Sequence, residues 1–403
     1  MNKTCLKWLI FLCFFCPSSA YADLFSLTLS QNGKTTIKEY TSVLDIFDSY
    51  EDGQLGTILE GYNTTDSATG ILNFRGIRME LDYAANSVLT FKVPTLGIDQ
   101  TFGAPGGTQE LSFKAFKEYL KANQNDLLTK ILKESVSNTP YDSIAGNPSS
   151  LMSQMVDSSF VNPVSSAMTA ALASQQTGGF FVYFPSGGTH KIKGSDGVER
   201  TATTFNMPLG YTFKFDNNWA LGIDLPLSYI DMDGSVTYAA QFGANLLIPL
   251  YKDKWYLTAG ARVGATASED SLSGGLLYMG TVASNFSFNV GKTTFTVSNM
   301  YGRIKDYTLD VEGYNIDYGL DNNVFKNGLQ VAHPLSEKTK LSFFFYDTRY
   351  TGSDLYIDAY DEVGISISKY FEKKSFFTGL DFTAAYTFGD NYKAYRVGFS
   401  LLF

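Results

Sequence analysis

The chain has 403 residues and a formal charge of −9, and 15% of its residues are aromatic. The acidic balance argues against a nucleic-acid partner, because phosphate binding needs a basic surface. The length allows two domains, and the sequence changes from helix-like to strand-like near residue 176.

Residues 1–22 have the layout of a signal peptide. Lys3 and Lys7 precede an apolar stretch, and Ala20 and Ala22 form an A-x-A site. This pattern predicts export and cleavage after Ala22. The alternative is an uncleaved anchor, but the apolar stretch is shorter than the ~20 residues that span a bilayer as a helix.

Cleavage would remove every cysteine, since Cys5, Cys13 and Cys16 all lie in this segment. The mature chain would then have no disulfide, no thiolate nucleophile and no cysteine metal site. Its formal charge would be −11, because Lys3 and Lys7 leave with the peptide.

Residues 23–145 are predicted to form a small α+β domain. Three segments indicate strands, namely LFSLTLS, ILNFRGIRMELDY and SVLTFKV. Ser112–Lys121 and Asn125–Ser135 indicate helices, with Ser112 and Asn125 as expected N-caps.

Residues 146–176 are predicted to be a helical linker or a lumen plug. Ser149–Phe160 and Val164–Gln175 are helix-like and separated by Pro163. The second helix is rich in Ala and Ser, so it could fit inside a narrow channel. The alternatives are a linker outside the channel and a helix packed on the small domain.

Residues 177–403 contain apolar residues at every second position, which is typical of strands with one apolar face. Odd positions from Trp219 to Tyr229 are all large and apolar, for example. Residues 305–322 are acidic and are interpreted as a loop. Twelve strands are predicted, at 178–186, 203–215, 219–230, 238–250, 254–266, 276–288, 293–304, 323–333, 338–349, 359–371, 375–388 and 392–403.

Short connections between these strands alternate with connections that are mostly longer. Outer-membrane barrels have an even number of strands, short periplasmic turns and longer external loops. The turns EKK, NVGK, KDK and DNN would share the periplasmic side with the last residue, whereas the tight link at Asp390 fits less well. A soluble β-sandwich is the alternative, but strands of this length suit a tilted membrane crossing better.

The last strand, YRVGFSLLF, places Tyr395, Phe399 and Phe403 on one apolar face. With the twelve strands and the preceding helix, it resembles autotransporter-type outer-membrane barrels. The resemblance implies that these three residues form the signal read by the barrel assembly machinery. It also implies a Gram-negative outer membrane, with lipid and lipopolysaccharide as partners. The repetitive passenger of large autotransporters is not evident, so the chain resembles a solitary barrel.

The predicted fold is therefore an all-β transmembrane barrel of twelve antiparallel strands, preceded by a small α+β domain and a helical segment. Alternation also predicts charged residues facing the lumen. They indicate either a water-filled pore or residues that hold an inserted helix. They are Asp224, Arg262, Lys326, Lys340, Glu362, Asp381 and Arg396.

No catalytic residue, metal ligand or cofactor is predicted. His190 is expected in the first external loop, near Ser195 and Asp196, and His333 on the opposite side, so the two cannot share a site. Acidic loop residues could bind Ca²⁺ but match no defined spacing. The expected function is envelope structure or passive transport without enzymatic activity; the alternatives are surface display of a short N-terminal passenger and, less favoured, an outer-membrane hydrolase using His190.

Overall fold

In a computed structural model, the described residues form two large antiparallel sheets, one two-stranded hairpin and a few helices. The described residues are 24–40, 55–85, 87–103, 107–160, 179–183, 185–194, 197–215, 219–251, 254–268, 273–311, 314–371 and 379–402. The predicted signal peptide with Ala20 and Ala22, the helix predicted over 164–175 and Phe403 lie outside them.

The first sheet has six strands in the order β2-β1-β3-β4-β5-β6. Alternate side chains of β1, β3 and β5 are buried because one face of the sheet forms a core, whereas the edge strands β2 and β6 each bury only their last residue. The bounds are β1 Phe25–Gln31, β2 Lys34–Tyr40, β3 Ala68–Phe74, β4 Ile77–Tyr83, β5 Leu89–Val93 and β6 Ile98–Phe102.

Three helices accompany this sheet: α3 Leu55–Ile58, α4 Gln109–Ala122 and α5 Gln124–Asn138. Phe116 of α4 packs on Phe91 and Phe102, with ring centroids 5.0 and 5.5 Å apart. The two predicted N-caps are wrong by a few residues. Thr108 caps α4, since its side chain accepts from Leu111 N–H, and α5 begins after Asn123. No helix among the described residues is long and apolar enough to cross a membrane.

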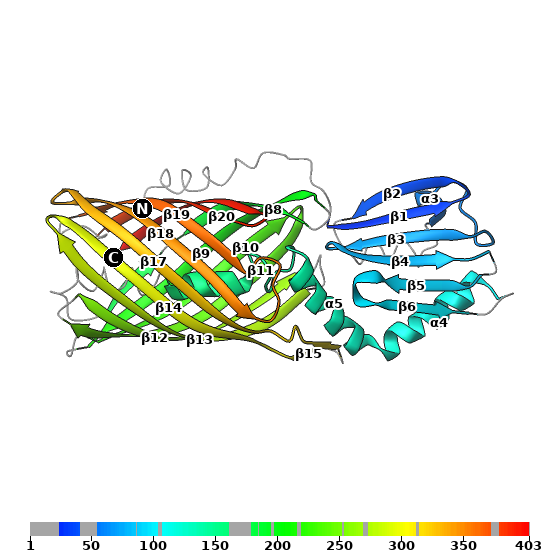
Figure 1. Cartoon of the computed structure of the whole chain (residues 1–403), viewed down its shortest axis with the longest axis horizontal. Coiled ribbons are helices and arrows are strands. Elements are labelled where there is room, and N and C mark those ends of the chain that lie inside the picture. The colour runs from blue at the N-terminus through cyan, green and yellow to red at the C-terminus, as the bar shows by residue number, and fades with distance from the viewer. Residues whose placement is uncertain are drawn as a thin grey trace, which may run out of the picture.

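The second sheet closes on itself (Figure 1). Its last strand pairs with both β7 and β8, which together form the first strand of the wall, so the described residues make twelve wall strands. The bounds are β7 Gly179–Tyr183, β8 Ser186–Lys193, β9 Glu199–Lys214, β10 Ala220–Met232, β11 Ser235–Tyr251, β12 Trp255–Ser268, β13 Ser273–Val290, β14 Thr293–Tyr307, β17 Asp321–Ser336, β18 Thr339–Gly352, β19 Ala359–Tyr370, β20 Gly379–Gly389 and β21 Tyr392–Leu402.

Two segments predicted as loops are partly strand. The predicted loop over 187–202 is wrong, because β8 continues to Lys193 and pairs with β21 along its length. The acidic segment 305–322 also differs, since β14 reaches Tyr307 and a short hairpin follows, β15 Leu309–Val311 and β16 Tyr314–Ile316. Near the barrel ends the outward face need not be apolar. The polar residues there therefore lack the alternation from which strands were predicted.

The outer surface of the wall is apolar over most of its circumference. Because lipid cannot hydrogen-bond to the backbone, a sheet can span a bilayer only when closed in this way. The closed pairing and the apolar exterior confirm the predicted fold class. Large apolar side chains exposed on the wall include Tyr211, Phe213, Leu225, Phe242, Val263, Val282, Phe286, Phe325, Phe343, Phe345, Ile367, Phe382, Tyr395 and Val397.

The two ends of the barrel differ. At one end, called here the terminal rim, β7 begins and β21 ends. The opposite end, called the loop rim, carries the longest connection, residues 308–320 with the β15–β16 hairpin. The six-stranded sheet and α5 lie at the loop rim (Figure 1).

Candidate functional site: the lumen and the loop rim

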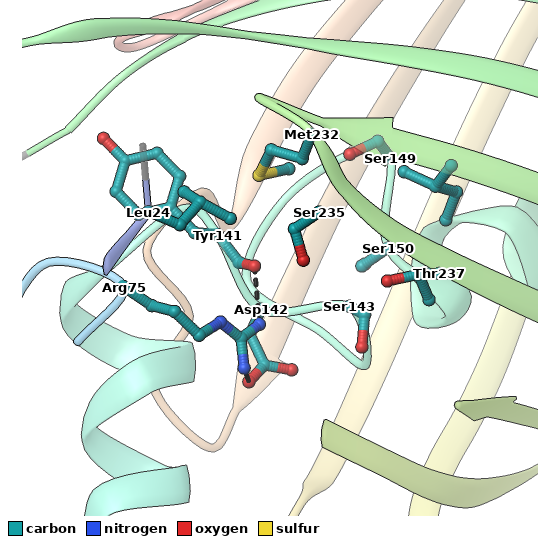
Figure 2. A pocket seen from close by; sticks show the side chains of 11 residues that line it. Leu24, Arg75, Tyr141, Asp142, Ser143, Ser149, Ser150, Met232, Ser235 and Thr237 are labelled. Carbon is teal, nitrogen blue, oxygen red and sulfur yellow. Dashed lines mark hydrogen bonds and ion pairs between the residues drawn. The ribbon is translucent and has the colours of Figure 1, made fainter. Parts of the chain in front are cut away.

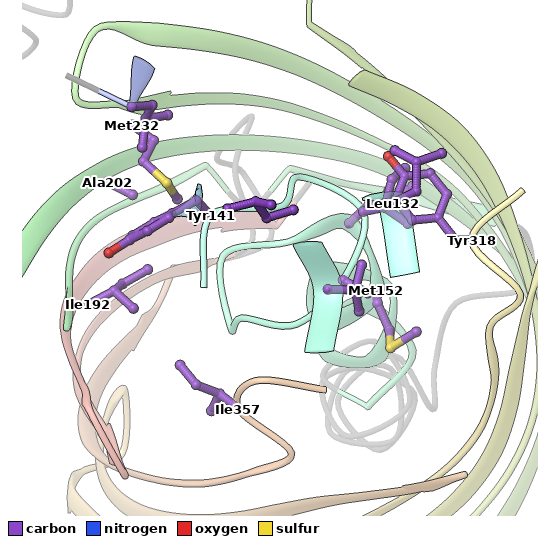
Figure 3. Packing of buried hydrophobic residues seen from close by; sticks show 14 of the residues in the cluster. Leu132, Tyr141, Met152, Ile192, Ala202, Met232, Tyr318 and Ile357 are labelled. Atoms are coloured by element: carbon purple, nitrogen blue, oxygen red, sulfur yellow. The ribbon is translucent and has the colours of Figure 1, made fainter. Parts of the chain in front are cut away.

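A helix over residues 151–160, called here the lumen helix, lies inside the barrel. Leu151, Met155 and Val156 are completely buried, and Met152 and Phe160 are each 1% exposed. Figure 3 shows Met152 within the ring of strands, with Leu132, Tyr318 and Ile357 in the same cluster. The first of the two predicted helices therefore occupies the lumen.

Glycines on the wall make room for this helix. A Cβ at Gly264 of β12 would lie 2.9 Å from Met155 Sδ and 3.0 Å from Leu151 Cδ1. A Cβ at Gly328 of β17 would lie 2.9 Å from Phe160 Cζ. At these two positions the helix therefore packs directly against the wall.

Asp157 anchors the lumen helix to two strands directly and to a third through Arg396. Its carboxylate pairs with Lys326 Nζ of β17 at 2.6 Å and with Arg396 Nη1 of β21 at 3.5 Å. Arg396 also donates to Glu362 of β19 at 2.7 Å. The Lys326 side chain is 3% exposed, so its charge depends on this carboxylate for compensation.

A second charged group holds the same helix on the opposite strands. Arg262 of β12 donates to the Asp224 carboxylate of β10 at 2.6 and 3.0 Å. Its Nε also donates to Ser159 Oγ of the lumen helix at 3.1 Å. Gly243 leaves space for the guanidinium, since a Cβ there would lie 2.6 Å from Arg262 Cζ.

The structure thus brings five of the seven predicted lumen charges into contact with the lumen helix or with a residue that binds it. The other two, Lys340 and Asp381, lie on either side of Ser368 on neighbouring strands, nearer the terminal rim. Asp381 accepts hydrogen bonds from Ser368 at 2.6 Å and from Thr383 at 2.9 Å. Such a lumen corresponds to the second interpretation, in which wall charges hold an inserted helix.

His190 lies in β8 and not in a loop. Its ring nitrogens bond to Tyr392 Oη at 2.6 Å and to Thr204 Oγ1 at 3.0 Å. Ser195 and Asp196 lie outside the described residues. His333 is near the terminal rim, where it bonds to Thr293 at 2.9 Å. Among the described residues, no group of three or more His, Cys, Asp or Glu side chains could hold a metal ion.

Residues 139–150, called here the neck, join α5 to the lumen helix and fill the loop rim. Asp142 is fully buried, pairs with Arg75 at 3.3 Å and accepts from Ser135 Oγ at 2.6 Å and Ile144 N–H at 2.8 Å. Arg75 also donates to the Tyr141 carbonyl at 2.6 Å (Figure 2). The cavity beside these residues measures about 10 Å³, which is room for about one water molecule.

Loops of the barrel close over the neck. Tyr356 and Ile357, between β18 and β19, donate backbone hydrogen bonds to Val136 and Gly146 at 2.9 and 3.1 Å. Arg200 of β9 lies over the Tyr141 ring, 4.5 Å from its centroid. Tyr318, between β16 and β17, is 3% exposed; burial, followed by the nearby Asp142 carboxylate, raises the pKa of its hydroxyl well above the usual value.

Two residues that bind the wall were not among the predicted site residues. Asp157 and Ser159 lie on the predicted helix, but their wall partners are about 100 residues or more away in sequence. An acidic residue in an otherwise small and apolar helix was the available signal. It was ambiguous, because a solvent-exposed helix carries the same residue types.

Strand pairing, apolar exterior and buried helix together define a transmembrane β-barrel whose lumen is occupied by its own chain. No protein-family model and no curated protein matches the sequence. Among solved structures, the chain is similar to the translocator domain of autotransporter NalP from Neisseria meningitidis. The TM-score is 0.46 and the identity 15%, over 63% of this chain and 99% of that one.

Two further solved structures are similar at lower scores. The beta domain of the Bordetella autotransporter Brka has a TM-score of 0.42 and 13% identity, over 56% of this chain and 99% of that one. The KdgM porin has a TM-score of 0.35 and 9% identity, over 55% and 99%. The fold assignment rests on the strand pairing and the closed seam of this chain.

Proposed function

We propose that this chain is an outer-membrane anchor that holds its six-stranded sheet at the cell surface. One observation carries the proposal: the lumen helix lies inside the barrel, between the sheet at one rim and the rim where the wall begins. The barrel would serve as a filled support, so display of a short N-terminal domain is favoured over passive transport.

The orientation follows from the general build of outer-membrane barrels. Their longer loops face outward, and an even strand number puts both ends of the wall on the periplasmic side. The terminal rim would then be periplasmic, and the loop rim with the sheet external. Lipid and lipopolysaccharide would surround the wall, and recognition of Tyr395, Phe399 and Phe403 by the assembly machinery belongs to the same proposal.

Cysteine labelling of intact cells tests the orientation. Ile37 of β2 is 64% exposed on the sheet. Ile37→Cys should react with a membrane-impermeant maleimide on intact cells, because the sheet would face outward. Cleavage of the predicted signal peptide would leave no other cysteine to react.

Lys338→Cys, in the exposed β17–β18 turn at the terminal rim, is the matched control. It should react only after the outer membrane is permeabilised. Labelling of Lys338→Cys on intact cells, with Ile37→Cys protected, would reverse the orientation and contradict surface display.

A further inference from the structure

One sector of the outer wall departs from the apolar surface found elsewhere. Five polar residues on four adjacent strands, called here the wall patch, point outward and are exposed or half-buried. They are Asn299 of β14, Asn327 of β17, Asp347 and Arg349 of β18, and Asp361 of β19. These strands lie side by side in Figure 1.

The wall patch reaches into the middle of the barrel wall. Asn299 lies near the centre of β14, opposite Asn327, and Asn327 is opposite Asp347 in the next pair of strands. The row on the terminal side is apolar, with Val297 opposite Leu329 and Leu329 opposite Phe345. The patch is therefore bordered by lipid-type surface and is not an extension of the terminal rim.

Polar groups in this position are costly when they face hydrocarbon. Charged substitutions on the lipid face of barrels cost about 2–4 kcal/mol at the midplane and less near the interfaces. Polar side chains at membrane depth accordingly pair with one another or with a partner. On β11 and β12, by contrast, outward positions such as Phe242 and Val263 are apolar.

The contacts within the wall patch restrict the kind of partner. Asn299 donates to Asn327 at 2.8 Å, and Arg349 pairs with Asp347 at 2.6 Å and with Asp361 at 3.4 Å. Nearer the loop rim, Arg303 and Lys305 both pair with Asp321, at 2.7 and 2.9 Å. With these three neighbours included, this sector of the wall has three cations and three carboxylates and no net charge.

A surface of this kind fits a partner that is equally mixed in charge and rich in hydrogen-bonding groups. It is poorly suited to the phosphates of an anionic lipid, because each cation already has a carboxylate beside it. A two-fold axis along the barrel would place the patch of one copy against the same patch of another. Carboxamides and paired charges would then be removed from hydrocarbon in both copies.

We propose that the wall patch is a lateral interface through which two copies of this chain associate within the membrane. Each copy offers the Asn299–Asn327 pair at mid-depth and the Arg349–Asp347 pair closer to the loop rim. The proposal requires only that the barrel spans a membrane, and it holds for either orientation of the sheet.

Disulfide cross-linking in isolated membranes tests the proposal. Asn327→Cys should give an oxidant-dependent dimer of the full chain, because the residue lies near the centre of the patch. Val263→Cys on β12 is the matched control; it is outward-facing and 38% exposed, and it should stay monomeric. Equal cross-linking of the two variants, or of neither, would overturn the proposal.

A second pair of measurements separates a protein partner from a lipid. In mild detergent, wild type should migrate as a dimer and N299L/N327L mainly as a monomer, with unchanged heat-modifiable mobility showing an intact barrel. A wild-type monomer would refute the interface. So would lipopolysaccharide that co-purifies with the wild type and is lost in N299L/N327L without a change of mass.

Discussion

Asp157 shows how one side chain can hold the barrel and its helix together. The outward or inward direction of wall residues follows from the period of two, so the seven lumen charges could be selected from sequence. Their contact partner on the lumen helix could not be predicted. Asp157 and Lys326 are 169 residues apart, and only the closed wall places them within 2.6 Å. His190 was misplaced because Thr189 and Lys191, on the outward face near the rim, lack apolar character.

Asp157→Ala should weaken the attachment of the lumen helix to the wall. The buried Lys326 ammonium would lose its carboxylate, which costs about 3 kcal/mol for a buried pair. Arg396 would retain Glu362, so the barrel should still close. The expected result is a lower melting temperature and more frequent openings in planar-bilayer recordings.

Asp126→Ala is the control for the loss of a carboxylate. Asp126 pairs with Lys130 on the exposed face of α5, and such a pair contributes at most about 1 kcal/mol. A similar fall in melting temperature for both variants would show that Asp157 does not anchor the helix.

At the scale of elements, the wall strands were predictable and the close contact of wall and helix was not. Twelve strands and their order follow from alternation and turns, whereas their lengths were underestimated near the loop rim. Turn chemistry could have corrected one end: Asp233 and Gly234 have φ of 48° and 87°, the geometry of a two-residue hairpin turn. The role of Gly264 could not be inferred, because a glycine in a strand has several possible causes.

Gly264→Leu should displace the lumen helix. The added side chain would enter the space of Met155 and Leu151, and overpacking of this kind costs about 1–3 kcal/mol. Ion conductance of the purified barrel should rise and its melting temperature should fall.

Gly280→Leu, on β13, is the matched control. A Cβ at Gly280 meets no atom within 4 Å, so a larger side chain should be accommodated without loss of stability. If the ion conductance of Gly264→Leu were as low as that of Gly280→Leu, the helix would not be the element that blocks the lumen.

At the scale of the whole molecule, the neck determines how the sheet meets the barrel. The sequence indicated two regions with a helical connection, but it did not indicate that residues 139–150 fill one rim. Their partners come from the β3–β4 turn, α5, β9 and two barrel loops, and such contacts have no periodic signature. Gly146 has a φ of 86°, and a Cβ there would collide with the Val136 carbonyl.

Gly146→Ala should therefore loosen the neck. The strained backbone costs about 1–3 kcal/mol, and the bond from Ile357 N–H to the Gly146 carbonyl would be disturbed. We expect limited proteolysis to release the sheet faster than in the wild type, with heat-modifiable mobility unchanged.

Gly97→Ala separates backbone strain from collision. Gly97 also has a positive φ, 64°, but a Cβ there meets nothing within 4 Å. Limited proteolysis should release the sheet more slowly from Gly97→Ala than from Gly146→Ala. Equal rates of release would show that backbone strain alone, without the collision, explains the effect of Gly146→Ala.

Arg396 couples the closing strand of the wall to the lumen helix. It lies on β21, the strand that completes the wall by pairing with β7 and β8, and it also pairs with Asp157. The closed wall and the lumen helix therefore stabilise each other through Arg396, and a barrel that closed empty would leave Arg396 with Glu362 alone.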